Sequence, residues 1–490
     1  MDQEKMSLLP SLDPKRSDTV AFNSSGSVAT NLEAEDQRRL LFQRRKRIIG
    51  HIFVICALLG LLFYKFMKSP RHFEFGHKPG NHQHRFHPHD AHLRWSDEDP
   101  LWVGRHTIAE LPFPSEMADY QCAEWPKVER NSPARSSTVQ TVEHRFELPL
   151  TSEVLFLLAQ GPFMNGNVNI TQSDEDRDSV VISVDTSYDD AEFLQSIQLC
   201  KVAGREGENG VGIFSSRRRP HPPRHDLHVY FDIRVEFPKG SEKSRLLVSD
   251  FKTDMRGAFG YQVANLSNTI FNSVSLSGAS KPIQVELLQA QSIQVKAANS
   301  PIDGNFTVDK SLRLSTANAH INVAATLLND KADKSMTEII LNTVNSPIEA
   351  SLSLFSFDSG EAATSDGAFC VRAHNAHSPI KLTFPTAPIN STVHVNAKTA
   401  MAPVDVQMHS TFEGAFTAQN SPFDKKVINA EEGPDPEGRD RKRNLIFDEM
   451  HGGTAKGHVY WGTGERGKDR GSLYDQEPHA RSQSVPECDA

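Results

Sequence analysis

The sequence predicts an all-β protein, either a repeat-built β-solenoid or an elongated β-sandwich, and two observations carry this prediction. The first is a turn that recurs at intervals of roughly 20 to 30 residues, as in stacked repeats. It reads Asn-Ser-Pro-Ile at 299–302 and 345–348, His-Ser-Pro-Ile at 377–380 and Asn-Ser-Pro-Phe at 420–423, with looser variants ending at Ile283, Ile321 and Val404. The second is period-two alternation of apolar residues between turns, for example over 348–354. Such alternation indicates strands with one buried face.

The turn itself has a physical rationale. Asn tolerates left-handed backbone angles and makes local hydrogen bonds, while Pro is accepted as the first residue of a strand. Stacking the units then buries the apolar side of each strand against its neighbours.

Composition limits the functional classes. The chain has 490 residues, enough for two or three domains. Its hydrophobic fraction of 38% lies below the roughly 45–50% that is usual for globular proteins, so part of the chain is expected to be unpacked. With a net charge of -9, the chain lacks the excess of positive charge that is typical of nucleic-acid-binding domains. Five cysteines are too few for a disulfide-dense scaffold, and the sequence does not determine their pairing.

The amino-terminal 68 residues predict a cytosolic tail and one membrane span. Residues 1–47 are polar and predicted to be disordered, and they end in six basic residues between Arg38 and Arg47. Residues 48–68 begin with an apolar run of about 17 residues, at the short end of what crosses a bilayer. The dense basic cluster before this run is expected to keep the amino terminus in the cytosol. The prediction is a type II single-pass protein of the endoplasmic reticulum, Golgi or cell surface.

Residues 69–120 predict a histidine-rich stalk and lead-in. Four closely spaced histidines are candidate ligands for weakly bound zinc, copper or nickel: His82, His84, His87 and His89. A mobile tract lacks the supporting contacts that a catalytic metal needs, so no cofactor is expected. Two alternatives stay open, a pH-responsive spacer and a polar linker of biased composition.

Residues 121–425 are expected to form the β-repeat domain. Its clearest early strand covers 227–237, and others are expected at 142–150, 154–158, 167–170 and 180–184. The segment 204–225 is rich in Gly, Pro and Arg, which predicts a solvated loop. Asp174-Glu175-Asp176 invites comparison with the Asp-x-Asp motif of glycosyltransferases. It lacks the alternating strand-and-helix context of a nucleotide-sugar domain, so we assign it no catalysis.

Four Asn-x-Ser/Thr acceptors follow the predicted span, and a lumenal or extracellular domain would carry glycans on them. They are Asn169, Asn265, Asn305 and Asn390. If a strand begins at Ile302, alternation places Asn305 on the outward face, as a glycan requires.

The repeat Thr/Asn-x-x-Pro/Gly-x-Ile with alternating strands resembles an adhesin-type β-solenoid family of unknown function found in bacteria. It is also similar to uncharacterised fungal single-pass membrane proteins with an adhesin-like domain. The resemblance covers residues 142–425, and this chain has Ser-Pro where those relatives usually have Gly. It implies no active site.

Residues 426–490 are charged and contain Pro and Gly, so we expect a mostly disordered tail with a possible last strand near 457–462. Arg441-Lys442-Arg443 resembles a dibasic processing site for Golgi proteases. The alternative is a plain solvated run of charge.

Three functions stay open. The first is a membrane-anchored, non-enzymatic adhesin-like or scaffold protein that binds a protein or carbohydrate, because no catalytic constellation is evident. The second is a carbohydrate-active enzyme on a β-helix. Its candidate carboxylates are Asp303, Glu338, Glu349 and Asp405, and two of them about 5 to 9.5 Å apart in a groove would favour it. The third is a metal- or pH-responsive protein acting through the stalk.

Overall fold

The structure is a computed structural model of the chain. It describes residues 120–126, 139–162, 164–215, 229–241, 243–332, 335–358, 361–363, 365–419, 428, 433–451, 453–463 and 471–476. All of them belong to one compact unit, Gly104–Ala490. The predicted tail, the predicted span and the stalk histidines lie outside these residues. Within the described ranges, no helix is both long enough and apolar enough to cross a membrane.

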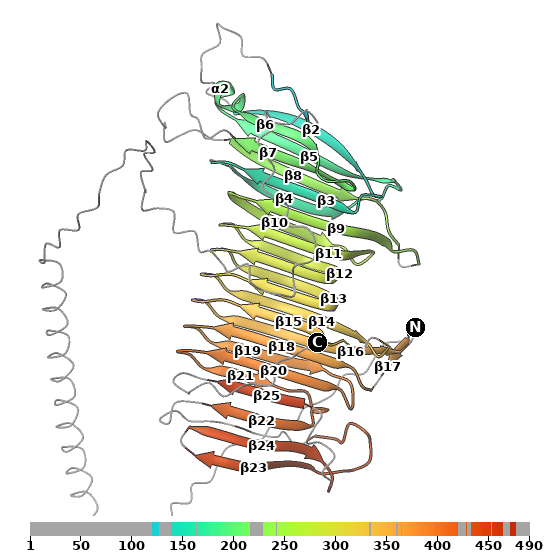
Figure 1. Ribbon diagram of the computed structural model, residues 1–490, viewed down its shortest axis with the longest axis vertical. Helices are drawn as coiled ribbons and strands as arrows, with labels where there is room; N and C mark the ends of the chain where they lie inside the picture. Colours follow the sequence, from blue (N-terminus) through green and yellow to red (C-terminus); the bar gives the residue numbers. More distant parts are fainter. Residues whose placement is uncertain are drawn as a thin grey trace, which may run out of the picture. The chain divides into compact units, whose positions relative to one another are not determined.

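The described residues are all-β, as predicted. Twenty-five strands are hydrogen-bonded into one continuous sheet. The helical element among the described residues is a single turn, α2 (Ala191–Leu194), whose amino end is capped by Asp190. Figure 1 shows the strands stacked side by side, with the colours following the chain along most of the stack.

The sheet curls into two layers that share one hydrophobic core. Layer B contains, in spatial order, β2 (Gln140–Pro149), β5 (Ser179–Tyr188), β8 (Val229–Phe237), β4 (Asn165–Gln172), β10 (Ala258–Asn265), the first half of β12 (Ile283–Ala297), the first half of β13 (Ile302–Ser315), β14 (Ile321–Asp330), β16 (Ile348–Asp358), β19 (Ile380–Thr386) and β21 (Val404–Gln407). The short β17 (Glu361–Ala363) pairs with the end of β16.

Layer A contains the strands that alternate with these along the chain. Their spatial order is β1 (Tyr120–Cys122), β6 (Ile197–Ala203), β7 (Glu208–Ser215), β3 (Val154–Gln160), β9 (Leu246–Met255), β11 (Thr269–Gly278), the second halves of β12 and β13, β15 (Thr337–Asn342), β18 (Ala368–Asn375), β20 (Thr392–Thr399), β25 (Gly471–Gln476), β22 (Gly414–Gln419), β24 (Thr454–Trp461) and β23 (Arg443–His451). The central strands are parallel, whereas antiparallel pairs occur at both ends of the stack.

The recurring turn sets the register of layer B. The residue after each turn starts a strand and lies directly opposite its equivalent in the next strand. In register, this row consists of Ile283, Ile302, Ile321, Ile348, Ile380 and Val404. The five isoleucines are at most 1% exposed, and burial of each contributes about 1.5–3 kcal/mol. The looser variants of the turn therefore belong to the same repeat, while the variant at 420–423 lies outside the described residues.

Glycine is required at one position where β13 approaches β12. Gly304 has a φ of +149°, and a Cβ there would collide with the carbonyl oxygen of Val285. The pairing of the two strands shifts its register immediately afterwards, between Val285 and Leu288. A second register shift, between Ala290 and Ser292, lies where β13 passes from layer B to layer A.

The first half of the domain contains more strands than the sequence suggests. Strands β2, β3, β4, β5 and β8 lie where alternation predicts them. The expected solvated loop at 204–225 is wrong for part of its length, because Glu208–Ser215 form the largely buried strand β7. Gly210 and Gly212 lie against the rings of Phe156 and Phe214, so these glycines mark close packing rather than a loop.

The carboxyl-terminal region also holds more strands than expected. β24 (Thr454–Trp461) lies where one last strand was expected, near 457–462, and it pairs with β23 in a hairpin. β25 lies between β20 and β22 and is parallel to both. β20 and β22 are close in sequence, yet in layer A they are separated by β25, which comes much later in the chain.

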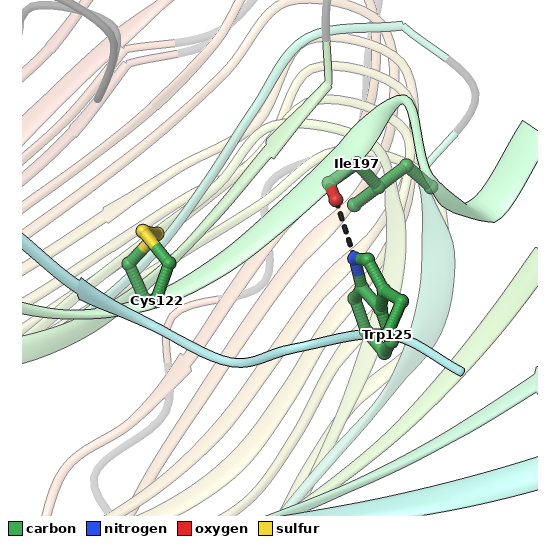
Figure 2. The surroundings of a disulfide bond; sticks show 4 residues. Cys122, Trp125 and Ile197 are labelled. Carbon is green, nitrogen blue, oxygen red and sulfur yellow. Dashed lines mark hydrogen bonds between the residues drawn. A yellow bond between two sulfur atoms is a disulfide. The ribbon is translucent and has the colours of Figure 1, made fainter. Parts of the chain in front are cut away.

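A disulfide closes the amino-terminal end of layer A. Cys122 of β1 is bonded to Cys200 of β6, which is its direct partner in the antiparallel pair. Beyond β1, the indole Nε1 of Trp125 donates a hydrogen bond of 2.6 Å to the carbonyl oxygen of Ile197 (Figure 2). Cys370 of β18 is disulfide-bonded as well.

Candidate binding surface

The outer face of layer B carries the candidate site, and the repeat positions its side chains. Side chains alternate between the two faces of a strand, so the residues that flank the buried isoleucines point outward. Because the strands are parallel and in register, equivalent outward residues form straight rows with a spacing of about 4.8 Å. Three such rows cross strands of layer B between β13 and β21.

The first row, here called the charged row, directly follows the isoleucines. It consists of Asp303, Asn322, Glu349, Lys381 and Asp405. Lys381 stands between two carboxylates, and all members except the half-buried Asp303 are exposed. Nε2 of His320 lies 3.0 Å from Oδ1 of Asp303. The row therefore presents three carboxylates and one lysine ammonium group, with Lys381 between Glu349 and Asp405.

The next two rows, here called the hydroxyl rows, are short and mostly polar. One consists of Asn305, Ala324, Ser351, Thr383 and Gln407, and the other of the buried Thr307 and the half-buried Thr326 and Ser353. Hydroxyl groups both donate and accept hydrogen bonds. Beyond them, Phe355 is 40% exposed beside its register partner Leu328. The face thus combines charge, hydroxyl groups and an apolar margin, which suits a broad polar ligand.

A side-chain ladder follows the turns between the layers. Nδ2 of Asn318 donates to Oδ1 of Asn299, and Nδ2 of Asn345 donates to Oδ1 of Asn318, both at 2.6 Å. Nδ1 of His377 lies 3.0 Å from Oδ1 of Asn345. The sequence predicts that these asparagines form local hydrogen bonds within their own turns. The structure shows that they also bond to the asparagines of neighbouring repeats. The available signal was the same residue type at the same position of successive repeats.

The outer face of layer A carries a compact ion-pair cluster. Glu338 of β15 lies between Arg313 of β13 and Arg372 of β18, with N–O distances of 3.3 and 3.2 Å. The side chains of Glu338 and Arg313 are only 16% and 12% exposed. Burial lowers the pKa of the neighbouring His374, and the positive charges of Lys398 and Arg372 lower it further. The charged side chains of this cluster are therefore paired with one another and largely shielded from solvent.

The four candidate carboxylates do not converge. Glu338 belongs to layer A, whereas the other three belong to the charged row of layer B. Within that row, Asp303 and Glu349 are separated by one strand, as are Glu349 and Asp405, which is about 10 Å along the sheet. Asn322 and Lys381 occupy the intervening positions. The arrangement of the described residues gives no support to a glycosidase pair.

The candidate glycan acceptors all belong to the described residues. Three of them are exposed: Asn265, Asn305 and Asn390. Asn169 is half-buried in β4, and its Nδ2 donates to Oδ1 of Asp232 at 2.9 Å. Asn305 does point outward, within a hydroxyl row, so a glycan there would cover one edge of the candidate surface.

The predicted metal ligands are not placed. His82, His84, His87 and His89 lie outside the described residues. Within the described part of the chain, no group of three or more His, Cys, Asp or Glu side chains could hold a metal ion. The triplet Asp174-Glu175-Asp176 is an exposed loop after β4, where Glu175 pairs with Arg177 at 2.8 Å.

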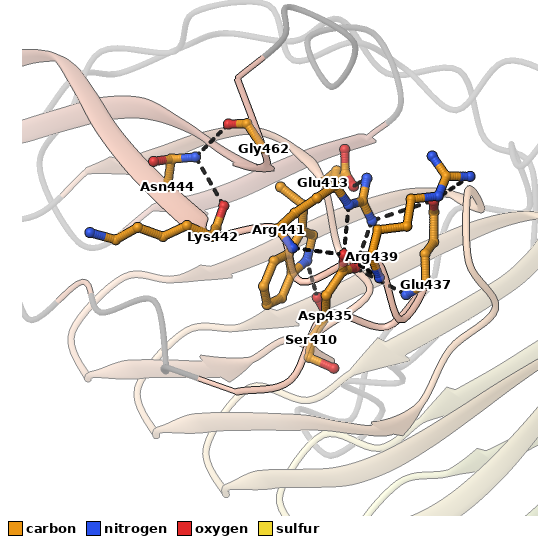
Figure 3. A network of polar contacts seen from close by, with 10 residues as sticks. Ser410, Glu413, Asp435, Glu437, Arg439, Arg441, Lys442, Asn444 and Gly462 are labelled. Carbon is orange, nitrogen blue, oxygen red and sulfur yellow. Dashed lines mark hydrogen bonds and ion pairs between the residues drawn. The ribbon is translucent and has the colours of Figure 1, made fainter.

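The dibasic motif belongs to a polar network before β23 (Figure 3). Asp435 accepts hydrogen bonds from Nε and Nη2 of Arg441, at 2.8 and 2.7 Å, and from the backbone N–H groups of Glu437, Arg439 and Arg441. The Asp435 side chain is 1% exposed. These bonds, with Arg441 contributing most, hold the pKa of Asp435 well below its usual range. The motif is therefore neither an open loop nor a plain solvated run of charge.

Comparison with known proteins finds structural similarity alone. No protein-family model matches the sequence, and no curated protein matches it. A solved structure from Parabacteroides merdae, named a "putative adhesin", is similar at 10% identity and a TM-score of 0.27, over 56% of this chain and 96% of that one. Proteins of the same name from Parabacteroides distasonis and Bacteroides fragilis are each similar at 11% identity and a TM-score of 0.29. These similarities cover 55% and 56% of this chain and 97% and 99% of theirs. The expected kinship with fungal membrane proteins stays a prediction.

Proposed function

We propose that this chain is a type II membrane-anchored, non-enzymatic β-solenoid that serves as an adhesin-like or scaffold protein. Its β-repeat domain faces the lumen or the cell exterior, and the outer face of layer B binds a protein or carbohydrate ligand. The observation that carries the proposal is the alignment of the charged row and the hydroxyl rows in one register.

A register-aligned surface suits binding rather than catalysis. Each outward side chain is fixed by a strand whose other face is buried in the core, so a ligand would meet a preorganised surface. Its polar groups are spread over several strands, whereas a catalytic site requires convergence of an acid, a base or a nucleophile on one reacting atom. A ligand with repeating polar groups would make many weak contacts across the rows.

Binding is tested with two matched lysine variants. Lys381→Glu reverses a charge in the charged row, and Lys296→Glu reverses an exposed charge on the outer face of layer A. The full chain is assayed against immobilised neutral, acidic and basic polysaccharides and against immobilised extracellular proteins. We expect binding to one of these probes that is unchanged by Lys296→Glu. Lys381→Glu should weaken it roughly tenfold if the probe is neutral or acidic and strengthen it if the probe is basic. Equal effects of the two variants, or no binding to any probe, would contradict the proposal.

The disulfides support the lumenal or extracellular placement. Cys122–Cys200 and the disulfide of Cys370 are bonds that persist in oxidising compartments and are rare in the cytosol. The placement is tested by digesting the expressed chain with an N-glycosidase. Digestion should increase electrophoretic mobility, and Asn265→Gln and Asn390→Gln should each remove one step of that increase. A chain without glycans would place the domain elsewhere.

Metal binding by the histidine-rich stalk is a separate prediction with its own test. A peptide covering His72–His92 contains the four candidate ligands, and calorimetric titration with zinc measures their affinity. Binding that is about millimolar or weaker would remove the metal-responsive alternative, because a mobile cluster of imidazoles gains affinity only if several bind one ion.

A further inference from the structure

The outer face of layer B is acidic near the turns from which its strands start. The first four residues of β12, β13, β14, β16, β19 and β21 contain four carboxylates and one lysine, a net charge of -3 in 24 residues. The carboxylates are those of Glu286, Asp303, Glu349 and Asp405, and the lysine is Lys381. A partner that complements this face carries positive charge.

Three of the four charges in the charged row have no partner among the described residues. Glu349, Lys381 and Asp405 are exposed, and their side chains form no hydrogen bond or ion pair with the described part of the chain. On the outer face of layer A, by contrast, Glu338 is paired with two arginines. The charged row therefore has charged groups that can pair with a ligand.

The carboxylates of the charged row recur on every second strand. Asp303, Glu349 and Asp405 belong to β13, β16 and β21, with β14 and β19 between them. Their spacing along the stack is therefore about 10 Å. Three residues of a polyproline-II chain advance about 9.3 Å, and every third side chain points in the same direction. Residues on one side of a β-strand recur at about 6.6 Å and do not match this spacing.

We propose that the ligand of layer B is a basic protein segment in an extended, polyproline-II-like conformation, which runs along the charged row with a lysine or arginine at every third position. This inference rests on the proposed binding function and names the class of partner. Lys381 stands between Glu349 and Asp405, so it disfavours further basic residues between the two that contact these carboxylates. The hydroxyl rows supply hydrogen-bond partners for the backbone of the segment, because a polyproline-II chain has no internal hydrogen bonds.

Synthetic peptides test the class of partner. A labelled peptide of Lys-Pro-Pro repeats presents a lysine at every third position of a polyproline-II chain, whereas a scrambled peptide of the same composition does not. Fluorescence anisotropy measures the binding of each peptide to the full chain. We expect the repeat peptide to bind roughly fivefold more tightly than the scrambled one, the size of one or two solvent-exposed ion pairs, and to bind more weakly as salt is raised. Equal affinity for the two peptides would overturn the inference.

Single-charge variants test whether the peptide lies on the charged row. Glu349→Gln and Asp405→Asn should each weaken binding of the repeat peptide roughly threefold, whereas Lys381→Gln should strengthen it by a similar factor. Asp440→Asn also removes an exposed carboxylate, but it lies before β23 and outside layer B, so it should leave the affinity unchanged. Equal weakening by Asp405→Asn and Asp440→Asn would mean a general attraction to the acidic chain and would overturn the inference.

Polysaccharide probes separate this inference from the proposed function. If a polysaccharide binds, Lys381→Glu alters that binding and neither peptide binds, the face is a binding surface but the inference of a basic protein segment is wrong. If neither the peptides nor any polysaccharide or protein probe binds, both the inference and the proposed function are wrong.

Discussion

At the scale of single residues, the carboxylate of Asp435 organises the segment before β23. It accepts five hydrogen bonds, three of them from backbone N–H groups. A protease needs an extended, accessible segment, and these bonds fold the dibasic motif back on Asp435. We therefore predict that the folded chain resists a dibasic-specific protease at Arg441–Arg443, and that Asp435→Asn is cut there roughly tenfold faster or more.

A matched control lies in the same segment. Asp440 has a φ of +55°, a conformation that Asn also tolerates, and its side chain is exposed. Asp440→Asn removes the same charge without touching the network, so its cleavage should equal that of the unmodified chain. Equal rates for Asp435→Asn and Asp440→Asn would show that the network does not protect the motif.

The lowered pKa of His374 predicts how the stability of the folded domain depends on pH. Its pKa is lowered by burial, then by Lys398 and Arg372, so the folded state holds it neutral. An unfolded histidine takes up a proton near pH 6.5. Between these pKa values the unfolded state binds more protons, so the stabilisation is complete above about pH 6.5 and declines as the pH falls.

Thermal unfolding between pH 8 and pH 5 measures this effect. His374→Gln should reduce the decrease in Tm on acidification. Asn342→Gln, at the register partner on β15, introduces no titrating group and should leave the decrease unchanged. A pH dependence that is identical in His374→Gln and in the unmodified chain would refute the assignment.

At the scale of elements, the row of isoleucines holds the strands of layer B together. Ile321 is fully buried, whereas its neighbour Asn322 points outward and is exposed. Ile321→Ala should lower the free energy of unfolding by about 2–5 kcal/mol, because it leaves a cavity. Asn322→Ala should change it by less than about 0.5 kcal/mol. Urea unfolding measures both, and a similar cost for the two variants would contradict the inward and outward assignment.

The sequence predicted those elements in which local pattern and tertiary role agree. Five of the turns precede an isoleucine, and each of these isoleucines is buried, so the repeat and the direction of Asn305 followed from spacing alone. β7 was missed because Gly210 and Gly212 look like loop residues until Phe156 and Phe214 are packed against them. β23 was missed because most of its residues are exposed on both faces, which leaves no alternation to detect.

The candidate surface could likewise be predicted only in part from the sequence. Its residues were visible in the sequence, and Asp303, Glu349 and Asp405 were considered as carboxylates. Their alignment depends on which strands are neighbours and in which register, and this information is not local. The bonds between Asp435 and Arg441 were hidden for a different reason, because a charged segment rich in Pro and Gly also has the composition of a disordered one.

At the scale of the whole molecule, both ends of the stack depart from the parallel repeat. A stack of repeats interacts only with its neighbours, so its terminal units need capping. At the amino-terminal end the caps are β2, antiparallel to β5, and β1, antiparallel to β6. At the other end of layer A, the β23–β24 hairpin follows β22. Two features of these end strands oppose pairing with further copies: β1 is only three residues long, and β23 carries charged side chains.

The Cys122–Cys200 disulfide makes the stability of the amino-terminal cap sensitive to reduction. It closes a loop between cysteines 78 residues apart, for which removal typically costs about 2–5 kcal/mol. We predict that Cys122→Ser/Cys200→Ser lowers Tm and increases hydrogen exchange in β1, β6 and β7. Because coupling in a stack passes between neighbours, protection in β14 and β16 should persist. Uniform loss of protection along the stack would show instead that the domain unfolds as one cooperative unit.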